Sequence, residues 1–156
     1  MSPSVDPSAP IDGPYDPACL FCSIVRGDTP AAVVDETPET VAFLDHRPLF
    51  FGHTLLVPRP HHVTLPDLPV DLVQPLFVQA QRLARAMGDA FGAAGSFVAM
   101  NNVVSQSVPH LHVHVVPRNR KDGLKGFFWP RTRYRDADHM AEVAAHIRRT
   151  LADTQG

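Results

Sequence analysis

The chain has 156 residues, 44% of them hydrophobic and 19% charged, which predicts one folded domain and excludes a disordered or fibrous chain. The net charge of −2 indicates no particular partner, and we expect no nucleic acid to bind. We also expect no membrane span, because no apolar run reaches roughly 18 residues, and no secretory signal. Two cysteines are too few for a secreted disulfide scaffold, so we expect the protein in the cytoplasm.

The first half of the chain predicts a tail followed by three strands. Residues 1–18 are rich in proline and bury too little apolar surface to fold, so we expect a flexible tail before a single domain at 19–156. Two β-rich runs, residues 31–35 and 40–44, flank a Thr-Pro-Glu turn and predict a hairpin. Residues 52–58 predict a third strand, which ends at the prolines that follow.

A long helix is predicted from Asp71 to Phe91, because apolar residues recur there at three- and four-residue steps. Asp71 and Gln74 resemble a capping box at its start. Gly92, directly after Phe91, is the residue type that commonly ends a helix.

Residues 96–100 and 111–116 predict two more strands, and an apolar stripe that begins near Asp136 or Asp138 predicts a final helix. Neighbouring strands are joined without helical crossovers, which favours antiparallel pairing. The sequence therefore predicts an α+β fold, in which an antiparallel five-stranded sheet carries two main helices.

Three of the nine histidines stand at alternate positions, His110, His112 and His114. Alternate side chains of a strand share one face, so the imidazoles line one side while Leu111 and Val113 face the core. Buried imidazoles need polar partners, which argues against plain core. An imidazole can attack phosphorus or an acyl carbon, act as an acid or base, or bind a metal, and the pattern leaves all three open.

The segment from Gln106 to Arg118 reads QSVPHLHVHVVPR and resembles the signature of the histidine-triad (HIT) nucleotide hydrolases and transferases. Blocks at residues 19–24, 42–45 and 52–61 match further blocks of that family in the same order. The resemblance implies a HIT-like fold and a two-fold homodimer, with the helix of residues 71–91 at the interface.

The resemblance also implies catalytic roles. His112 would attack the α-phosphorus of a nucleotide and form a covalent nucleotidyl-histidine, which water or another acceptor would resolve. His114, Ser107 and Gln106 would contact the phosphate and assist the leaving group. His53 would support the three histidines without contacting the nucleotide itself.

For the nucleotide, the resemblance implies that Asp45 accepts hydrogen bonds from the ribose hydroxyls. Contacts to the sugar or phosphate would come from Asn101 or Asn102. The walls around the base would be apolar residues that composition alone would assign to the core: Phe21, Ile24, Phe43 and Leu44. Two departures from the family stand out, because residues 101–106 are shorter than usual and lack glycine, and His46 replaces a small apolar residue.

Cys19 and Cys22 form a Cys-x-x-Cys pair, which alone is a weak signal. The resemblance to some bacterial members of the family implies that both thiols bind one zinc ion together with His61 and His110. Four protein ligands leave no open position, so this Zn²⁺ would be structural. The alternative is two buried free thiols beside ordinary hydrogen-bonding histidines.

Residues 118–135 hold half of the basic residues, around a Gly-Phe-Phe-Trp-Pro sequence at 126–130. Cations and aromatic rings together suit a polyphosphate or a stacked base, although a solvated loop with an aromatic anchor fits equally.

The implied reaction is hydrolysis or transfer at the α-phosphate of a nucleoside phosphoramidate, a dinucleoside polyphosphate or an acyl-adenylate, with a purine nucleotide as the expected substrate. Two alternatives stay open. One is a nucleotide-binding protein without catalysis, and the other is a zinc metallohydrolase in which the three histidines hold a metal with an open water position.

Overall fold

The computed structural model describes residues 12–124 and 132–153 and divides into two compact units, residues 1–122 and 123–156. The second unit contains helix α3 (Ala137–Asp153), which confirms the predicted final helix. No helix among the described residues is long and apolar enough to cross a membrane. The predicted sheet lies in the first unit.

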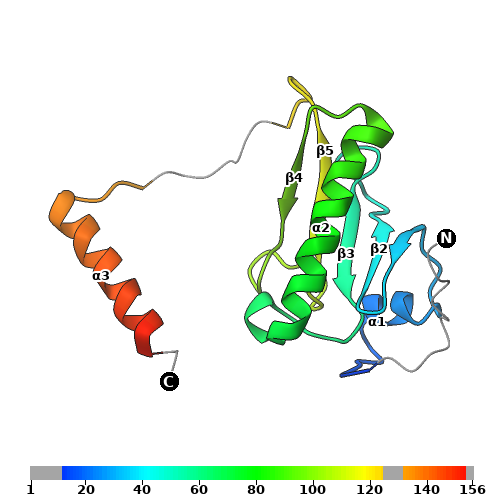
Figure 1. Ribbon diagram of the computed structural model, residues 1–156, viewed down its shortest axis with the longest axis horizontal. Helices are drawn as coiled ribbons and strands as arrows, with labels where there is room; N and C mark the ends of the chain where they lie inside the picture. Colours follow the sequence, from blue (N-terminus) through cyan, green and yellow to red (C-terminus); the bar gives the residue numbers. More distant parts are fainter. Residues whose placement is uncertain (1–11, 125–131, 154–156) are drawn as a thin grey trace. The chain divides into compact units, whose positions relative to one another are not determined.

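Five strands form one antiparallel sheet in the order β1-β2-β3-β5-β4 (Figure 1). They are β1 (Val33–Glu36), β2 (Thr40–Leu44), β3 (Thr54–Pro58), β4 (Gly95–Ala99) and β5 (Val113–Arg118). Each lies within two residues of its predicted position, and the predicted α+β class with an antiparallel five-stranded sheet is confirmed. Because β5 lies between β3 and β4, the strand that carries His114, and that His110 and His112 directly precede, has a neighbour on both sides.

Helix α2 (Val70–Phe91) begins one residue earlier than predicted and has no capping box. Pro69 occupies the N-cap position without a side-chain hydrogen bond, so Asp71 lies inside the first turn instead of preceding it. At the other end Gly92 adopts φ 62, and its N–H donates to the Gly88 carbonyl, as predicted for a terminal glycine.

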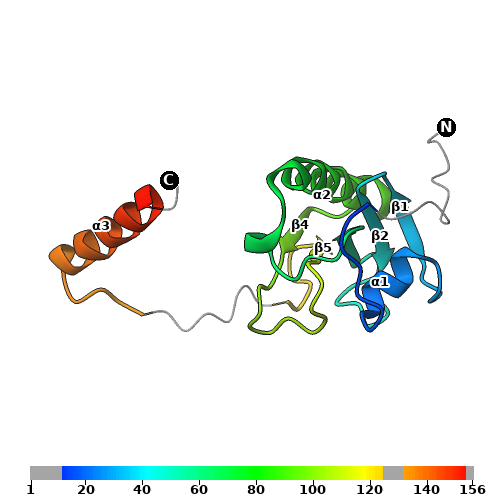
Figure 2. The ribbon, with the colours of Figure 1, turned by 90° about the horizontal axis from the view of Figure 1, so that it is seen from below.

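The sheet has a helix on each face (Figure 2). Helix α2 buries Leu76, Ala80, Leu83 and Met87 in one core cluster, together with residues of β2, β3, β5 and the segment directly before β5: Ala42, Leu56, Leu111, Val113 and Val115. Helix α1 (Leu20–Val25) packs on the opposite face against a second set: Val41, Phe43, Leu55 and Val57. The period of two along each strand thus separates two cores, and the histidines face α1.

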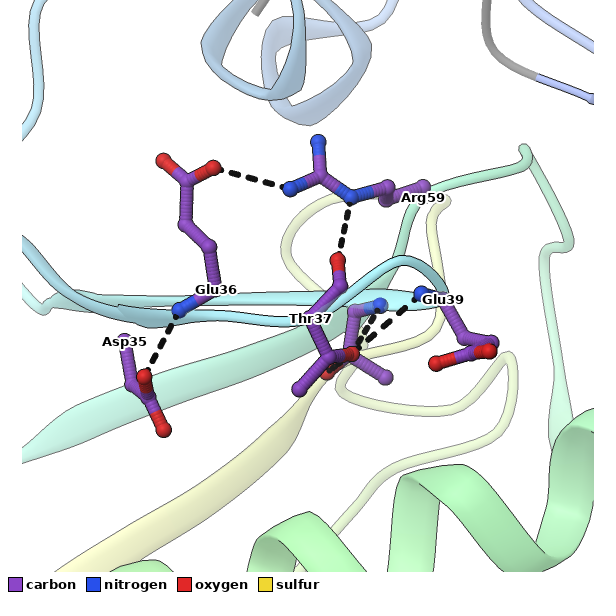
Figure 3. A network of polar contacts seen from close by, with 6 residues as sticks. Asp35, Glu36, Thr37, Glu39 and Arg59 are labelled. Atoms are coloured by element: carbon purple, nitrogen blue, oxygen red, sulfur yellow. Dashed lines mark hydrogen bonds and ion pairs between the residues drawn. The ribbon is translucent and has the colours of Figure 1, made fainter. Parts of the chain in front are cut away.

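Arg59, at the end of β3, ties the β1–β2 turn to the segment that follows it (Figure 3). Its guanidinium donates to the Thr37 carbonyl (2.7 Å) and to Oε2 of Glu36 (2.8 Å), while its backbone N–H donates to the Glu39 carbonyl (2.8 Å). Arg59 is only 8% exposed, and a buried cation needs such partners. This network fixes the start of the loop that leads to His61.

Candidate functional site

Three imidazoles are gathered on the α1 face where β5 begins. His110 and His112 are 0% and 2% exposed, while Leu111 and Val113 lie in the core beneath α2. The predicted alternation along this segment is therefore confirmed. The ring of Phe21, from α1, stands edge-on to His112 with centroids 5.2 Å apart.

The hydrogen bonds of His112 determine which of its nitrogens is free. Nδ1 lies 2.7 Å from the carbonyl oxygen of His110. A carbonyl only accepts, so Nδ1 carries the proton and Nε2 of the neutral ring keeps its lone pair. That lone pair is the form of imidazole that can act as a nucleophile.

His114 is held by a chain of hydrogen bonds that starts at the backbone. The N–H of Leu49 donates to Nδ1 of His53 (3.1 Å), which places the proton of His53 on Nε2. That Nε2–H donates to Nδ1 of His114 (2.9 Å), so His114 carries its own proton on Nε2. Burial lowers the pKa of His53, and burial together with the neighbouring His112 lowers the pKa of His114 to about 4. Both rings are therefore neutral near pH 7.

A cleft of about 630 Å³ lies between α1, the C-terminal end of β2 and the histidines. Of the residues predicted for the nucleotide or the chemistry, eight line it: Phe21, Ile24, Phe43, Leu44, Asp45, Ser107, His112 and His114. His46 lines it as well and is an exposed side chain. The remaining walls were not anticipated from the sequence: Leu20, Leu55, Val108 and the segment from Thr29 to Ala32. That segment follows α1 through a turn, and no local motif marks it.

Three of the predicted polar residues organise the loop before Ser107 and do not line the cleft. The Gln106 side chain donates to the Val63 carbonyl (2.6 Å) and accepts from the Val103 N–H (3.0 Å). Asn101 donates to the Ser105 carbonyl (3.2 Å). Asn102 accepts from the backbone N–H of residue 65 (2.7 Å).

This loop is also strained, since Val103 and Ser105 have φ angles of 67° and 61°. Glycine adopts such angles readily, whereas a β-branched residue does so at a cost of about 1–2 kcal/mol. The short, glycine-free sequence at 101–106 thus builds its turn from side-chain amides and strained backbone.

A second cluster lies behind Phe21, where Cys19, Cys22, His61 and His110 bring four ligand atoms within 4.8 Å of one another. Nδ1 of His110 is 3.5 and 3.6 Å from the two sulfur atoms, and Nδ1 of His61 is 3.3 Å from Sγ of Cys22. The residues that the sequence predicted as metal ligands therefore meet at one point.

The donor set of this cluster fits a metal. Nε2 of His110 donates to the Pro58 carbonyl (2.9 Å), which leaves Nδ1 without a proton and directed at the thiols. Burial lowers the pKa of His110 to about 4 and raises that of Cys22 to about 11, so a cation would have to offset the cost of a buried thiolate. Two thiols and two imidazoles are the ligand types of a closed zinc site.

The chain on either side of this cluster is anchored. The backbone N–H of His61 donates to the carbonyl of Pro14 (2.7 Å), and the guanidinium of Arg26 lies 4.6 Å from the ring centre of Tyr15. These contacts involve residues within the predicted 1–18 tail, of which the structure describes 12–18.

Asp45, His53 and His114 form another triplet of possible ligand atoms within 4.8 Å. Here the donor set does not fit a metal, because Nε2 of His53 carries the proton that the Leu49 N–H forces upon it. Oδ2 of Asp45 lies 3.7 Å from this Nε2. Within the triplet, His53 and His114 therefore form a hydrogen-bonded relay, with the carboxylate of Asp45 close to His53.

Of the basic segment at 118–135, residues 125–131 lie outside the described residues. Arg118 binds Asp122 through two hydrogen bonds, 2.5 and 3.1 Å long. The Ala94 N–H donates to Oδ1 of Asn119 (3.0 Å), which joins the turn after β5 to the start of β4. In the described part, residues 118–122 of this segment thus stabilise the turn that follows β5.

Comparison with known proteins agrees with this geometry. The HIT domain model matches residues 26–121. Protein hit from Bacillus subtilis is 33% identical over 140 residues, which cover 87% of this chain and 96% of that protein. Adenosine 5'-monophosphoramidase from Saccharomyces cerevisiae is 37% identical and covers 70% of this chain, with 68% of its own length matched.

Among solved structures, a Zn-bound histidine triad family protein from Mycobacterium smegmatis is similar, with 39% identity and a TM-score of 0.66. The match covers 73% of this chain and 84% of that one. A family model that spans most of the described first unit, and relatives above 30% identity, lead to one conclusion. The chain belongs to the HIT family.

Proposed function

We propose that the protein is a nucleotide hydrolase or transferase that attacks the α-phosphate of a nucleoside phosphoramidate, a dinucleoside polyphosphate or an acyl-adenylate. One observation carries the proposal. Nε2 of His112 has a free lone pair in a cleft, because Nδ1 is bound to the His110 carbonyl at 2.7 Å. The name of the yeast relative, a monophosphoramidase, supports the same substrate class.

The reaction has two steps. Nε2 of His112 forms a bond to phosphorus while the bond from phosphorus to the leaving group breaks, and the leaving group takes up one proton from solvent, which the attacking water of the second step returns. The imidazole becomes positively charged, and the His110 carbonyl stabilises that charge at Nδ1–H. Water then attacks phosphorus, the N–P bond breaks, and the nucleoside monophosphate and neutral His112 are released.

The other polar groups of the cleft would support this chemistry. Nε2–H of His114 would donate to a phosphate oxygen, since the His53 relay holds its proton there. Ser107 lines the cleft and would donate to the phosphate or the leaving group. Gln106, Asn101 and Asn102 would act by holding the loop in shape, as their hydrogen bonds favour.

Nucleotide binding would use the opposite end of the cleft. The carboxylate of Asp45 would accept from the ribose hydroxyls, and the apolar walls of Phe21, Ile24, Phe43 and Leu44 would hold a purine base. A volume of about 630 Å³ is ample for one nucleotide.

Zinc and a homodimer complete the proposal. Cys19, Cys22, His61 and His110 would bind structural Zn²⁺, which would link α1 to the sheet. The two free thiols also suit a reducing, cytoplasmic setting. An apolar groove of about 470 Å³ between α2 and β4, with Val78 and Val98 half-exposed, would be the two-fold interface.

Rapid mixing with an adenosine phosphoramidate, followed by intact-protein mass spectrometry, tests the proposal. We expect a transient adduct of AMP mass on the wild-type chain, with AMP release, and neither in His112→Ala. Binding of AMP without adduct or release would instead support a binding protein without catalysis. Release that survives in His112→Ala would show that another group is the nucleophile.

A further inference from the structure

Helix α1 is too short to be stable by itself. It has six residues, its N-cap Cys19 makes no side-chain capping hydrogen bond, and its first turn has no acidic residue. Isolated helices below about 12 residues are marginal in water, so the position of α1 depends on the groups that hold it.

Those groups belong to two different sites. Cys19 and Cys22 point into the metal cluster, whereas Phe21 and Ile24 line the nucleotide cleft. The same short helix and its N-cap residue therefore contribute two of four possible metal ligands and part of the proposed base wall.

We propose that metal binding and nucleotide binding are coupled through α1, so that a zinc-class divalent cation at the cysteines tightens the site for a nucleotide base. The inference rests on the proposed function, because it concerns the same cleft. A metal joins α1 to His61 and His110 and so holds Phe21 and Ile24 in place. Without it, α1 keeps its apolar contacts, the hydrogen bonds of Ser23 to residues 28 and 29, and the weaker contacts between the thiols and the imidazoles.

The coupling also reaches the nucleophile. The ring of Phe21 lies edge-on to His110 and to His112, with centroid distances of 6.0 and 5.2 Å. It also packs against Phe43 at 5.3 Å. A displacement of α1 would remove one side of the packing around His112 as well as the wall for the base. Phe21 is accordingly a positioning residue.

Thermodynamic linkage makes the inference measurable without any assay of catalysis. If the cation raises the affinity for a nucleotide by some factor, the nucleotide raises the affinity for the cation by the same factor. We expect about tenfold, within the range of typical coupling energies.

The experiment measures AMP affinity by calorimetry on zinc-loaded and zinc-free full-length protein, with far-ultraviolet circular dichroism to monitor the fold. Zinc affinity is then measured by competition with a chromophoric chelator, with and without saturating AMP. Ribose 5-phosphate is the control ligand, because it reaches the histidines but has no base to contact α1. We expect AMP, and not ribose 5-phosphate, to tighten zinc binding.

Two variants separate α1 from the rest of the cleft. Phe21→Leu keeps all four ligands, and we expect it to bring the coupling factor close to one. Leu44→Ala changes a cleft residue on β2, so it should weaken AMP binding and leave the coupling factor unchanged. Because AMP in solution binds the same amount of zinc whichever protein is present, comparing the variants with the wild-type chain also corrects for that effect.

The outcomes are distinct. Three outcomes would overturn the inference and leave the proposed function standing. They are an AMP affinity that is equal with and without zinc, an increase in zinc affinity that is as large with ribose 5-phosphate as with AMP, and an undiminished coupling factor in Phe21→Leu. Global unfolding without zinc, or failure to bind zinc, would also overturn it. If the zinc-loaded protein binds no AMP at all, the proposed function fails first.

Discussion

The backbone carbonyl of His110 accepts a hydrogen bond from Nδ1 of His112, while the imidazole of the same His110 faces the two thiols. One residue therefore serves the nucleophile with its main chain and the metal cluster with its side chain. The alternation of residues 110–113, directly before and into β5, makes this possible, since residues two apart lie on one side and Leu111 and Val113 on the other.

His53 should matter through the proton that it donates to His114. We expect His53→Leu to lower kcat on an adenosine phosphoramidate by about tenfold to a hundredfold, because a mispositioned donor is costly at a reacting centre. His53→Gln can still donate from its amide and should recover most of the rate. Equal losses in the two variants, seen in steady-state kinetics, would exclude the relay.

Burial of His114 should make stability depend on pH. Its pKa is lowered to about 4, against about 6.5 in an unfolded chain, so the unfolded state binds more protons between those values. The free energy of unfolding is therefore highest above pH 6.5 and falls as the pH drops toward 4, by at most about 1.4 kcal/mol per pH unit for one group.

Urea unfolding of zinc-free protein at several pH values measures this slope. His114→Gln removes the titrating group, so its slope should be shallower than that of the wild-type chain. Identical slopes would mean that His114 is not the group responsible.

The zinc content of the protein should depend on the four ligand residues of the cluster. We expect about one zinc ion per chain by elemental analysis, lost in His61→Ala, with a melting temperature lowered by several degrees. His62→Ala is the matched control, because the adjacent His62 is outside the cluster and should keep the metal. Wild-type protein that purifies without zinc and shows two titratable thiols would refute the site.

The left-handed backbone conformation of Val103 should lower the stability of the fold, and a glycine at this position should relieve that strain. Val103→Gly should stabilise the fold by up to about 1 kcal/mol, because glycine tolerates φ 67 and its greater unfolded entropy offsets only part of the gain. Val104, 78% exposed, is not among the residues with positive φ, so Val104→Gly should destabilise. Denaturant midpoints of the two variants on opposite sides of the wild type would agree with this account.

The groove between α2 and β4 should be the dimer contact. Val78→Glu places a charge among half-exposed apolar side chains, and we expect it to convert a dimer to a monomer in sedimentation velocity. Phe51→Glu, at a site 88% exposed and outside the groove, should leave the dimer intact. A wild-type chain that sediments as a monomer would remove the interface altogether.

Local patterns sufficed for the strands, for α2 and for the alternation of His112 with Leu111 and Val113, because periodicity is a property of neighbouring residues. The start of α2 escaped them, since Asp71 and Gln74 have the composition of a cap without its geometry. Nothing local relates Gln106 to Val63, 43 residues away.

The His53–His114 pair spans 61 residues and depends on the register of β3 against β5. Its tautomers depend further on one backbone N–H from Leu49. The family resemblance predicted both histidines as site residues. The direction of their hydrogen bonds depends on three-dimensional contacts that no local pattern shows. The cleft wall from Thr29 to Ala32 likewise follows from how α1 packs, not from its sequence.

The place of β5 in the sheet has a consequence for how the protein is made. β5 follows β3 and β4 in the chain but lies between them, so β3 can pair early with β2, whereas β4 has no partner strand until β5 has been synthesised. Such late, non-local pairing is slow compared with helix formation. His110 and His112 directly precede β5, whereas the thiols of Cys19 and Cys22 have been in the chain from near its start. The hydrogen bond between His53 and His114 therefore forms only after β5 has joined β3.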